Sequence, residues 1–194
     1  MTPVMPRSIL APFLKFSTEG EIIGRLLAGY SNLEIGLMHC VQMARGNDLD
    51  TVLKKMFAKR GETRRIDDAE NLFLSHHTHH GLLGDFQKAI RLVRYCLKIR
   101  NQYAHGVWWD DYSGKLAFAN MEELGVRKRK VQDLRKLKPY HVDAKLLAAQ
   151  EACFVYADEY LAWINHEGRV RSGMAKANPL PKPRPIKRPR LRLP

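Results

Sequence analysis

Apolar residues recur along much of this chain at the three- and four-residue steps of an α-helix. The clearest run steps by four, three and four, through Phe86, Ile90, Val93 and Leu97. It predicts a helix over residues 85–104, with Asp85 as its N-cap. Gly106 predicts the end of that helix.

The same spacing predicts four further helices, over residues 17–45, 49–57, from about 67 onward, and 142–167. Residues 107–120 instead mix aromatic and β-branched residues around Asp110-Asp111-Tyr112-Ser113-Gly114, which is typical of a β-hairpin. We therefore expect an all-α fold, an antiparallel bundle of about five helices with a small hairpin inserted after the helix over residues 85–104.

The predicted helix over residues 85–104 ends in polar residues that can carry chemistry. Arg100 occupies a position where the pattern asks for a buried aliphatic side chain, and Asn101 and His105 follow it. A buried guanidinium needs an anion, so we expect a bound anion or an acid within hydrogen-bond distance of Arg100. Glu34 interrupts the apolar face of the first helix. It is either a buried acid that orients Arg100 or one of the polar residues after it, or a half-exposed glutamate.

Arg100, Asn101 and His105, at a helix end within helical residues 17–168, resemble the Arg-polar-x-x-x-His signature of the HEPN superfamily. Many HEPN proteins are metal-independent ribonucleases of toxin–antitoxin, anti-phage or CRISPR systems. The resemblance implies a homodimer that cleaves RNA in one composite cleft, with no cofactor and no metal. In it, His105 would transfer protons, Arg100 would stabilise the transition-state phosphate and Asn101 would orient the phosphate. Val107 stands where HEPN toxins modified on tyrosine carry that tyrosine.

Two other interpretations of the motif stay open at this point. Arg100 can simply match the dipole at the C-terminal end of the helix, with His105 as a structural histidine. A HEPN-like protein can also bind RNA or a nucleotide without cleaving it, or serve as a helical scaffold. Tyr103, Trp108 and Trp109 are candidate substrate-binding residues; the tryptophans would roof the site or stack on bases, or one of them simply fills the edge of the core.

The net charge of +13 is concentrated near the C-terminus. Residues 169–194 hold nine Lys and Arg and no acid, which leaves 24 basic and 20 acidic residues in the rest of the chain. Six of the ten prolines lie there too, so we expect a disordered or polyproline-like tail that binds nucleic acid or docks an antitoxin or other partner protein. A second basic run is a solvated surface or a guide for RNA, with Arg127, Lys128, Arg129 and Lys130 as candidate contacts.

The remaining composition narrows the class of protein. The expected division is an N-terminal arm over residues 1–16, a helical domain over 17–168 and the tail over 169–194. Three widely spaced cysteines on apolar faces indicate reduced thiols, and no apolar run is long enough to span a bilayer, so we expect a cytoplasmic protein without membrane contact. His76 and His80 share a helix face and would need a further ligand to hold zinc or nickel; we assign no metal to them.

Overall fold

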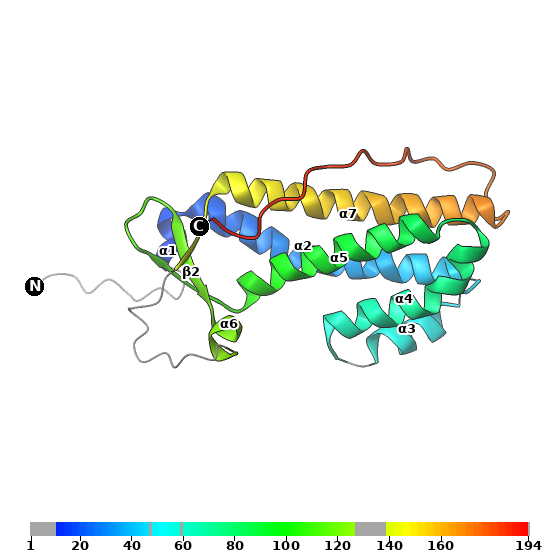
Figure 1. Ribbon diagram of the computed structural model, residues 1–194, viewed down its shortest axis with the longest axis horizontal. Coiled ribbons are helices and arrows are strands. Elements are labelled where there is room, and N and C mark those ends of the chain that lie inside the picture. Colours follow the sequence, from blue (N-terminus) through cyan, green and yellow to red (C-terminus); the bar gives the residue numbers. More distant parts are fainter. Residues whose placement is uncertain (1–10, 47, 59, 127–138, 194) are drawn as a thin grey trace, which may run out of the picture.

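The computed structural model describes residues 11–46, 48–58, 60–126 and 139–193, in which helices predominate and one small sheet forms (Figure 1). The helices are α1 (Ala11–Lys15), α2 (Ser17–Ala44), α3 (Leu49–Phe57), α4 (Glu62–His79), α5 (Leu83–Ala104), α6 (Met121–Gly125) and α7 (Ala144–Arg171). The strands are β1 (Gly106–Asp110), β2 (Leu116–Asn120) and β3 (Tyr140–Val142). The mostly helical fold is confirmed, although the described residues form seven helices and three strands rather than about five helices and a hairpin.

Helices α2, α5 and α7 form the core of the molecule. Pairs between α2 and α7 advance together along both helices, from Arg25 with Glu151 to Cys40 with Leu161, so these helices run parallel. Helix α5 runs the other way, since its early residue Asp85 bonds to Tyr160, late in α7. The expected antiparallel arrangement therefore holds for α5 against α2 and α7 but not for α2 against α7. Helix α5 returns the chain to the end where α2 begins, and α7 starts at that end, next to the sheet (Figure 1).

The short helices α3 and α4 cover the side of α2 and α5 away from α7. Asp48 caps α3 through a hydrogen bond from the Thr51 amide, which explains the start of α3. Helix α4 begins at Glu62, earlier than the expected start near residue 67, because Arg94 and Arg100 of α5 pair with acids in its first turns. Its end includes His76, whose ring centroid lies 4.3 Å from that of His80.

The sheet lies at one end of the helices and has the order β1-β2-β3, antiparallel throughout. In the β1–β2 register Trp108 lies opposite Phe118, and the two rings stack with centroids 4.9 Å apart. The predicted hairpin is confirmed, and β3 extends it. Phe13 of α1 packs on Trp108 from outside, so the described part of the N-terminal arm lies on the body.

Residues 172–193 run from the end of α7 back along the helices to the sheet (Figure 1, red). We call the extended segment 178–193 the strap. Its end pairs with the sheet, since the Leu193 amide donates to His141 O, and Leu191 and Leu193 pack on the core. This placement differs from the disordered alternative that the composition predicts; the other alternative, a polyproline-like segment, is also extended.

The physical reason for this placement lies in the side chains on which the strap rests. Arg188 stacks over Tyr95 with 3.5 Å between Cζ and the ring centroid, and Arg192 stacks over Tyr140 at the same distance. The long apolar stems of these cationic side chains therefore supply packing contacts, which the absence of apolar periodicity had argued against. None of the helices in the described ranges is both long and apolar enough to cross a membrane.

Candidate functional site

We call Arg100, Asn101 and His105 the motif. It occupies the last turn of α5 and the residue after it, as the sequence predicts. Helix α5 ends at Ala104 and His105 is its C-cap residue. The Arg100 Nη1 atom donates a 3.0 Å hydrogen bond to Asn101 Oδ1, so these two side chains are coupled. The acids that pair with the motif come from α4 and α6, which lie on the same side of α5 in Figure 1.

Arg100 is partly buried, with 28% of its side chain exposed, and it has an acidic partner. That partner is Glu62, the first residue of α4, whose Oε1 lies 3.4 Å from Arg100 Nη1. The expectation of an acid beside Arg100 is thereby met, but by a residue that the helical pattern did not single out. A phosphate that used this guanidinium would have to displace the Glu62 carboxylate.

Glu34 is buried, but it does not orient Arg100. Both of its carboxylate oxygens accept from Arg65 Nη1 of α4, at 2.9 and 3.0 Å. The alternative that it is a half-exposed glutamate is wrong, and so is the assignment to Arg100. The pair instead fixes α4 against α2, because both charges are largely removed from water and each needs the other.

Tyr30 connects the two ion pairs. Its hydroxyl is buried and has no hydrogen-bond partner among the described residues. Burial raises its pKa, and the carboxylates of Glu34 and Glu62 raise it further while Arg100 opposes them. Tyr30 therefore lies near both ion pairs, between α2, α4 and α5.

His105 is the more accessible half of the motif, with 43% of its side chain exposed. Its Nε2 lies 3.2 Å from Glu122 Oε1 of α6, and its backbone oxygen accepts from the Met121 amide. Asn120 holds this corner together, because its Nδ2 donates to the backbone oxygens of Asn101 and Gln102 while its Oδ1 caps α6. A carboxylate beside an exposed imidazole orients the ring through its nitrogen, and an oriented, accessible imidazole suits proton transfer.

Two of the aromatic candidates belong to the core rather than to the site. The Tyr103 side chain is buried, and its hydroxyl donates to Gln150 of α7. Trp108 packs between Phe13, Tyr103 and Phe118, so it fills the edge of the core. Trp109 follows it in the same strand, points to the opposite face by the alternation of side chains, and is partly exposed.

Gly106 ends the helix for a reason other than the one expected. Its backbone is not among the left-handed positions, so the usual glycine C-cap does not apply. A Cβ at this position would lie 3.1 Å from the Trp108 ring. Glycine is therefore favoured here, because a larger residue would push against the indole that lies on the backbone.

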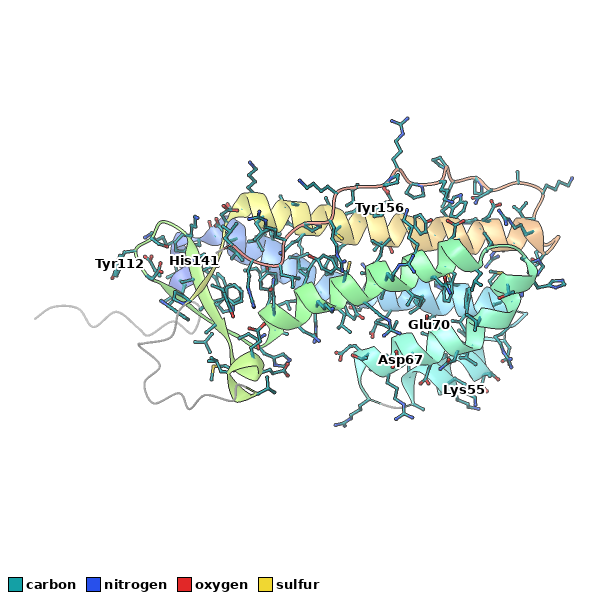
Figure 2. All side chains as sticks on the ribbon, viewed as in Figure 1. Lys55, Asp67, Glu70, Tyr112, His141 and Tyr156 are labelled. Carbon is teal, nitrogen blue, oxygen red and sulfur yellow. The ribbon has the colours of Figure 1, made fainter. Side chains whose placement is uncertain are left out.

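The structure also brings together groups that the pattern of the chain did not reveal. Glu62 and Glu122 reach the motif from α4 and α6, and each carried only the weak signal of an acid at the first or second position of a helix. A second imidazole–carboxylate pair joins His141 Nε2 to Asp111 Oδ2 at 2.8 Å. This pair lies at the sheet end, where Figure 2 labels His141, and it fastens the hairpin tip to β3.

Some predicted contacts gain no support. Arg127, Lys128, Arg129 and Lys130 lie outside the described residues. Within the described ranges, no three His, Cys, Asp or Glu side chains are grouped so as to hold a metal ion.

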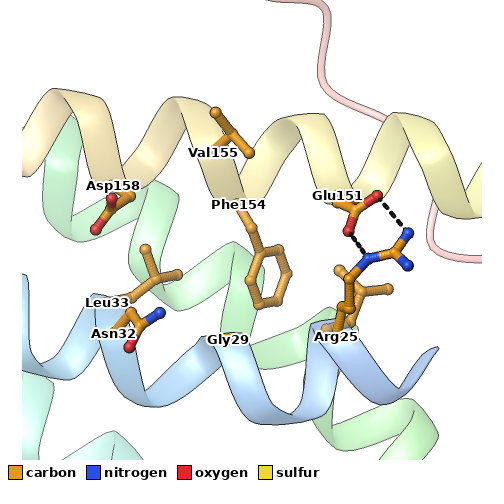
Figure 3. Close-up of a pocket in the computed structure, with 9 residues that line it drawn as sticks. Arg25, Gly29, Asn32, Leu33, Glu151, Phe154, Val155 and Asp158 are labelled. Atoms are coloured by element: carbon orange, nitrogen blue, oxygen red, sulfur yellow. Dashed lines mark hydrogen bonds and ion pairs between the residues drawn. The ribbon is translucent and has the colours of Figure 1, made fainter. Parts of the chain in front are cut away.

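A pocket of about 200 Å³ lies between α2 and α7 (Figure 3). Arg25 and Glu151 form an ion pair across it, so these two charges neutralise each other. Its other polar lining residues are Asn32 and Asp158, and no residue of the motif lines it.

The comparisons with known proteins leave the geometry as the main guide to function. No protein-family description, no curated protein and no solved structure matches the chain.

Proposed function

We propose that this chain is a metal-independent endoribonuclease of HEPN type that works as a symmetric dimer in a toxin–antitoxin or anti-phage setting. One observation carries the proposal. A partly buried arginine, hydrogen-bonded to Asn101, and an exposed histidine beside a carboxylate stand at the end of one helix. A group that transfers protons and a cation that stabilises the phosphate support cleavage of RNA through its own 2′-hydroxyl.

The chemistry follows from the properties of these groups. An imidazole accepts the 2′-hydroxyl proton, the 2′-oxygen attacks the adjacent phosphorus, and the bond to the 5′-oxygen breaks. The leaving 5′-oxygen takes a proton from a second imidazole, and a 2′,3′-cyclic phosphate remains. Arg100 stabilises the extra negative charge on the five-coordinate phosphorus, and Asn101 orients the phosphate.

A dimer supplies what one protomer lacks. The reaction needs a base and an acid, and the motif offers one histidine, His105. A two-fold axis that passes close to the end of α5 would place a second Arg100 and a second His105 in the same cleft. Glu62 would neutralise Arg100 until RNA arrives, so that two guanidiniums can approach each other without a large repulsion.

The test compares purified wild type with His105→Ala on a fluorescent single-stranded RNA in EDTA. Wild type should cleave and leave a 2′,3′-cyclic phosphate, whereas His105→Ala should lose at least a hundredfold in rate because proton transfer is lost. His39→Ala, on an exposed face of α2, is the matched control, since among the described residues the His39 side chain bonds only to Gln42. Equal cleavage by His105→Ala would refute the proposal, and so would a monomer in sedimentation that is fully active.

A second candidate is binding of RNA or a nucleotide without cleavage. The observation that favours it is that Arg100 and His105 both have carboxylate partners, Glu62 and Glu122. On this alternative, His105→Ala would weaken RNA binding while wild type shows no cleavage in any condition.

A further inference from the structure

The strap presents a rigid, cationic edge to solvent. Five prolines between residues 178 and 189 fix their own φ angles and restrict the residues before them to extended conformations, which favours a polyproline II helix. Such a segment is already ordered before it binds anything. It therefore loses little conformational entropy when it docks on the protein or on a partner.

Besides the stacked arginines, the strap is held through its backbone oxygens. Gln150 Nε2 donates to Arg190 O and Leu191 O at 2.8 Å each, and Gln102 Nε2 donates to Leu191 O at 2.6 Å. Since the backbone carries these contacts, side chains on the outer face remain available. Lys187 and Arg190 are exposed, and neither has a side-chain hydrogen bond or ion pair among the described residues.

A cationic pocket of about 180 Å³ opens between the strap and α5. Its charged lining residues are Lys88, Arg91 and Arg188, and no carboxylate lines it. Its apolar lining residues are Leu92, Tyr95, Cys153 and Ile186. Three cations around an aromatic and aliphatic floor form an environment for a negatively charged group attached to a flat, apolar one.

We infer that this pocket and the outer edge of the strap bind single-stranded RNA, separately from the motif. A phosphate contacts Arg91 and Lys187, the next phosphate contacts Arg190, and one base enters the pocket beside Tyr95. The assignment rests on the proposed function for the choice of RNA as the polyanion. The structure favours it because the pocket is smaller than the roughly 300 Å³ of typical small-molecule sites, so it suits one base rather than a larger ligand.

An anionic membrane is the less suitable partner. Membrane-surface segments insert a continuous apolar face beside their cations. The strap exposes Ile186, at 42%, and Leu180, at 37%, six residues apart, while Leu191 and Leu193 pack inward. The strap therefore has cations for phosphates but no apolar face for acyl chains.

The experiment measures binding of a fluorescein-labelled twelve-nucleotide oligouridine by anisotropy, in EDTA, between 50 and 300 mM KCl. The test variant is Arg91→Gln, Lys187→Gln and Arg190→Gln together. The control replaces Lys55, Lys115 and Lys145 by Gln, which removes the same charge from exposed lysines on α3, the hairpin and the start of α7 (Lys55 is labelled in Figure 2). Both sets are measured in the His105→Ala background so that the RNA stays intact.

The test variant should bind at least tenfold more weakly at 100 mM KCl, and its salt slope should fall by about 2, because each lost contact to single-stranded RNA removes about 0.7. The control should change affinity less than threefold. Equal losses in both sets would overturn the inference, since binding would then follow net charge alone. Tighter binding to duplex RNA or to phosphatidylserine vesicles, lost in the same variant, would overturn the assignment to single strands.

Cleavage assays separate this inference from the proposed function. In an active protein the three substitutions, one on α5 and two on the strap, should raise KM and leave kcat within twofold, because none of them touches the motif. If wild type binds with the predicted variant dependence but cleaves nothing, the proposed function fails and the inference stands. If wild type cleaves and the strap variant keeps its KM, the inference fails and the proposed function stands.

Discussion

Gln150 is the point at which the motif helix, α7 and the strap are joined, and its replacement by leucine is the most informative stability test. The side chain is fully buried. Its Oε1 accepts from the Tyr103 hydroxyl, and its Nε2 donates to Arg190 O and Leu191 O. Leucine keeps the volume of the side chain and removes all three hydrogen bonds at once.

The expected cost can be assembled from these contacts. The Tyr103 hydroxyl, on a residue with 2% exposure, would be left unpaired, which costs about 1–3 kcal/mol. Leu191 O keeps its bond from Gln102, and Arg190 O, on an exposed residue, can be hydrated, so these two losses add about 1 kcal/mol. Leucine returns about 1 kcal/mol of apolar burial. The free energy of unfolding should therefore fall by about 2 kcal/mol, which corresponds to roughly 4–8 °C in Tm for a chain of this size.

Urea unfolding measures the loss of stability, and trypsin digestion shows whether the strap is released. Gln150→Leu should release the strap, so that trypsin cleaves after Arg190 faster than in wild type, whereas Gln87→Leu on α5 should change unfolding by less than about 0.5 kcal/mol. Adding Tyr103→Phe should recover about 1 kcal/mol, since neither partner is then left unpaired. Unchanged trypsin cleavage together with additive effects of the two substitutions would show that the strap and the Tyr103 bond do not depend on Gln150.

Two further predictions concern the sheet end. Gly106→Ala should destabilise the fold by about 1 kcal/mol and shift the tryptophan emission, because its Cβ meets the stacked Trp108 ring. Gly24→Ala, with nothing within 4 Å of the added Cβ, should stabilise the fold by up to about 1 kcal/mol. Equal effects at both positions would contradict this reasoning. Hydrogen bonds from Ser113 and His141 lower the pKa of Asp111 to about 2, below the unfolded value of about 3.9. Asp111→Asn should therefore cost about 1 kcal/mol at pH 7. Urea unfolding should show that difference shrinking as the pH falls from about 4 through 2, and a difference that is undiminished at pH 2 would show that charge is not its cause.

The positions of the helices followed from the sequence because each rests on a local signal. The apolar period placed α2, α5 and α7 to within a few residues, and Asp110-Asp111-Tyr112-Ser113-Gly114 placed the hairpin turn. The parallel packing of α2 and α7 did not follow, because the apolar period shows where each helix lies in the chain but not which helices pack together in space. The motif likewise appeared at the predicted helix end, but its acidic partners did not, since ion pairs between elements leave no periodic trace.

The docking of the strap on the helices could not be predicted, for a different reason. Apolar periodicity counts whole residues, whereas the strap docks through backbone oxygens and through the stems of Arg188 and Arg192 over tyrosine rings. Arginine counts as a polar residue in a sequence pattern, although its stem packs on apolar surface in the structure. The buried Glu34 was recognised as unusual, yet its partner Arg65 precedes the segment expected to be helical, so the pair could not be assigned from spacing alone.

The remaining question is whether Arg100 is a catalytic group or a clamp between α4 and α5, and Arg94 offers the matched control. Arg94 pairs with Asp67 at 2.7 Å and Glu70 at 2.8 Å, both labelled in Figure 2, and is about as exposed as Arg100. Since a third of each side chain meets solvent, Arg100→Ala and Arg94→Ala should each cost about 1 kcal/mol or less in urea unfolding.

Their effects on function should differ sharply. Arg100→Ala should abolish RNA cleavage, by at least the hundredfold typical of a lost charge-stabilising donor, while Arg94→Ala should stay within threefold of wild type. Glu62→Gln should have the opposite effect to Arg100→Ala, lowering KM because RNA no longer displaces a carboxylate from the guanidinium. If Arg100→Ala unfolds the protein, or if both arginine variants lose activity in proportion to their stability, Arg100 is a clamp. The ribonuclease assignment would then rest on His105 alone, which is too little to support it.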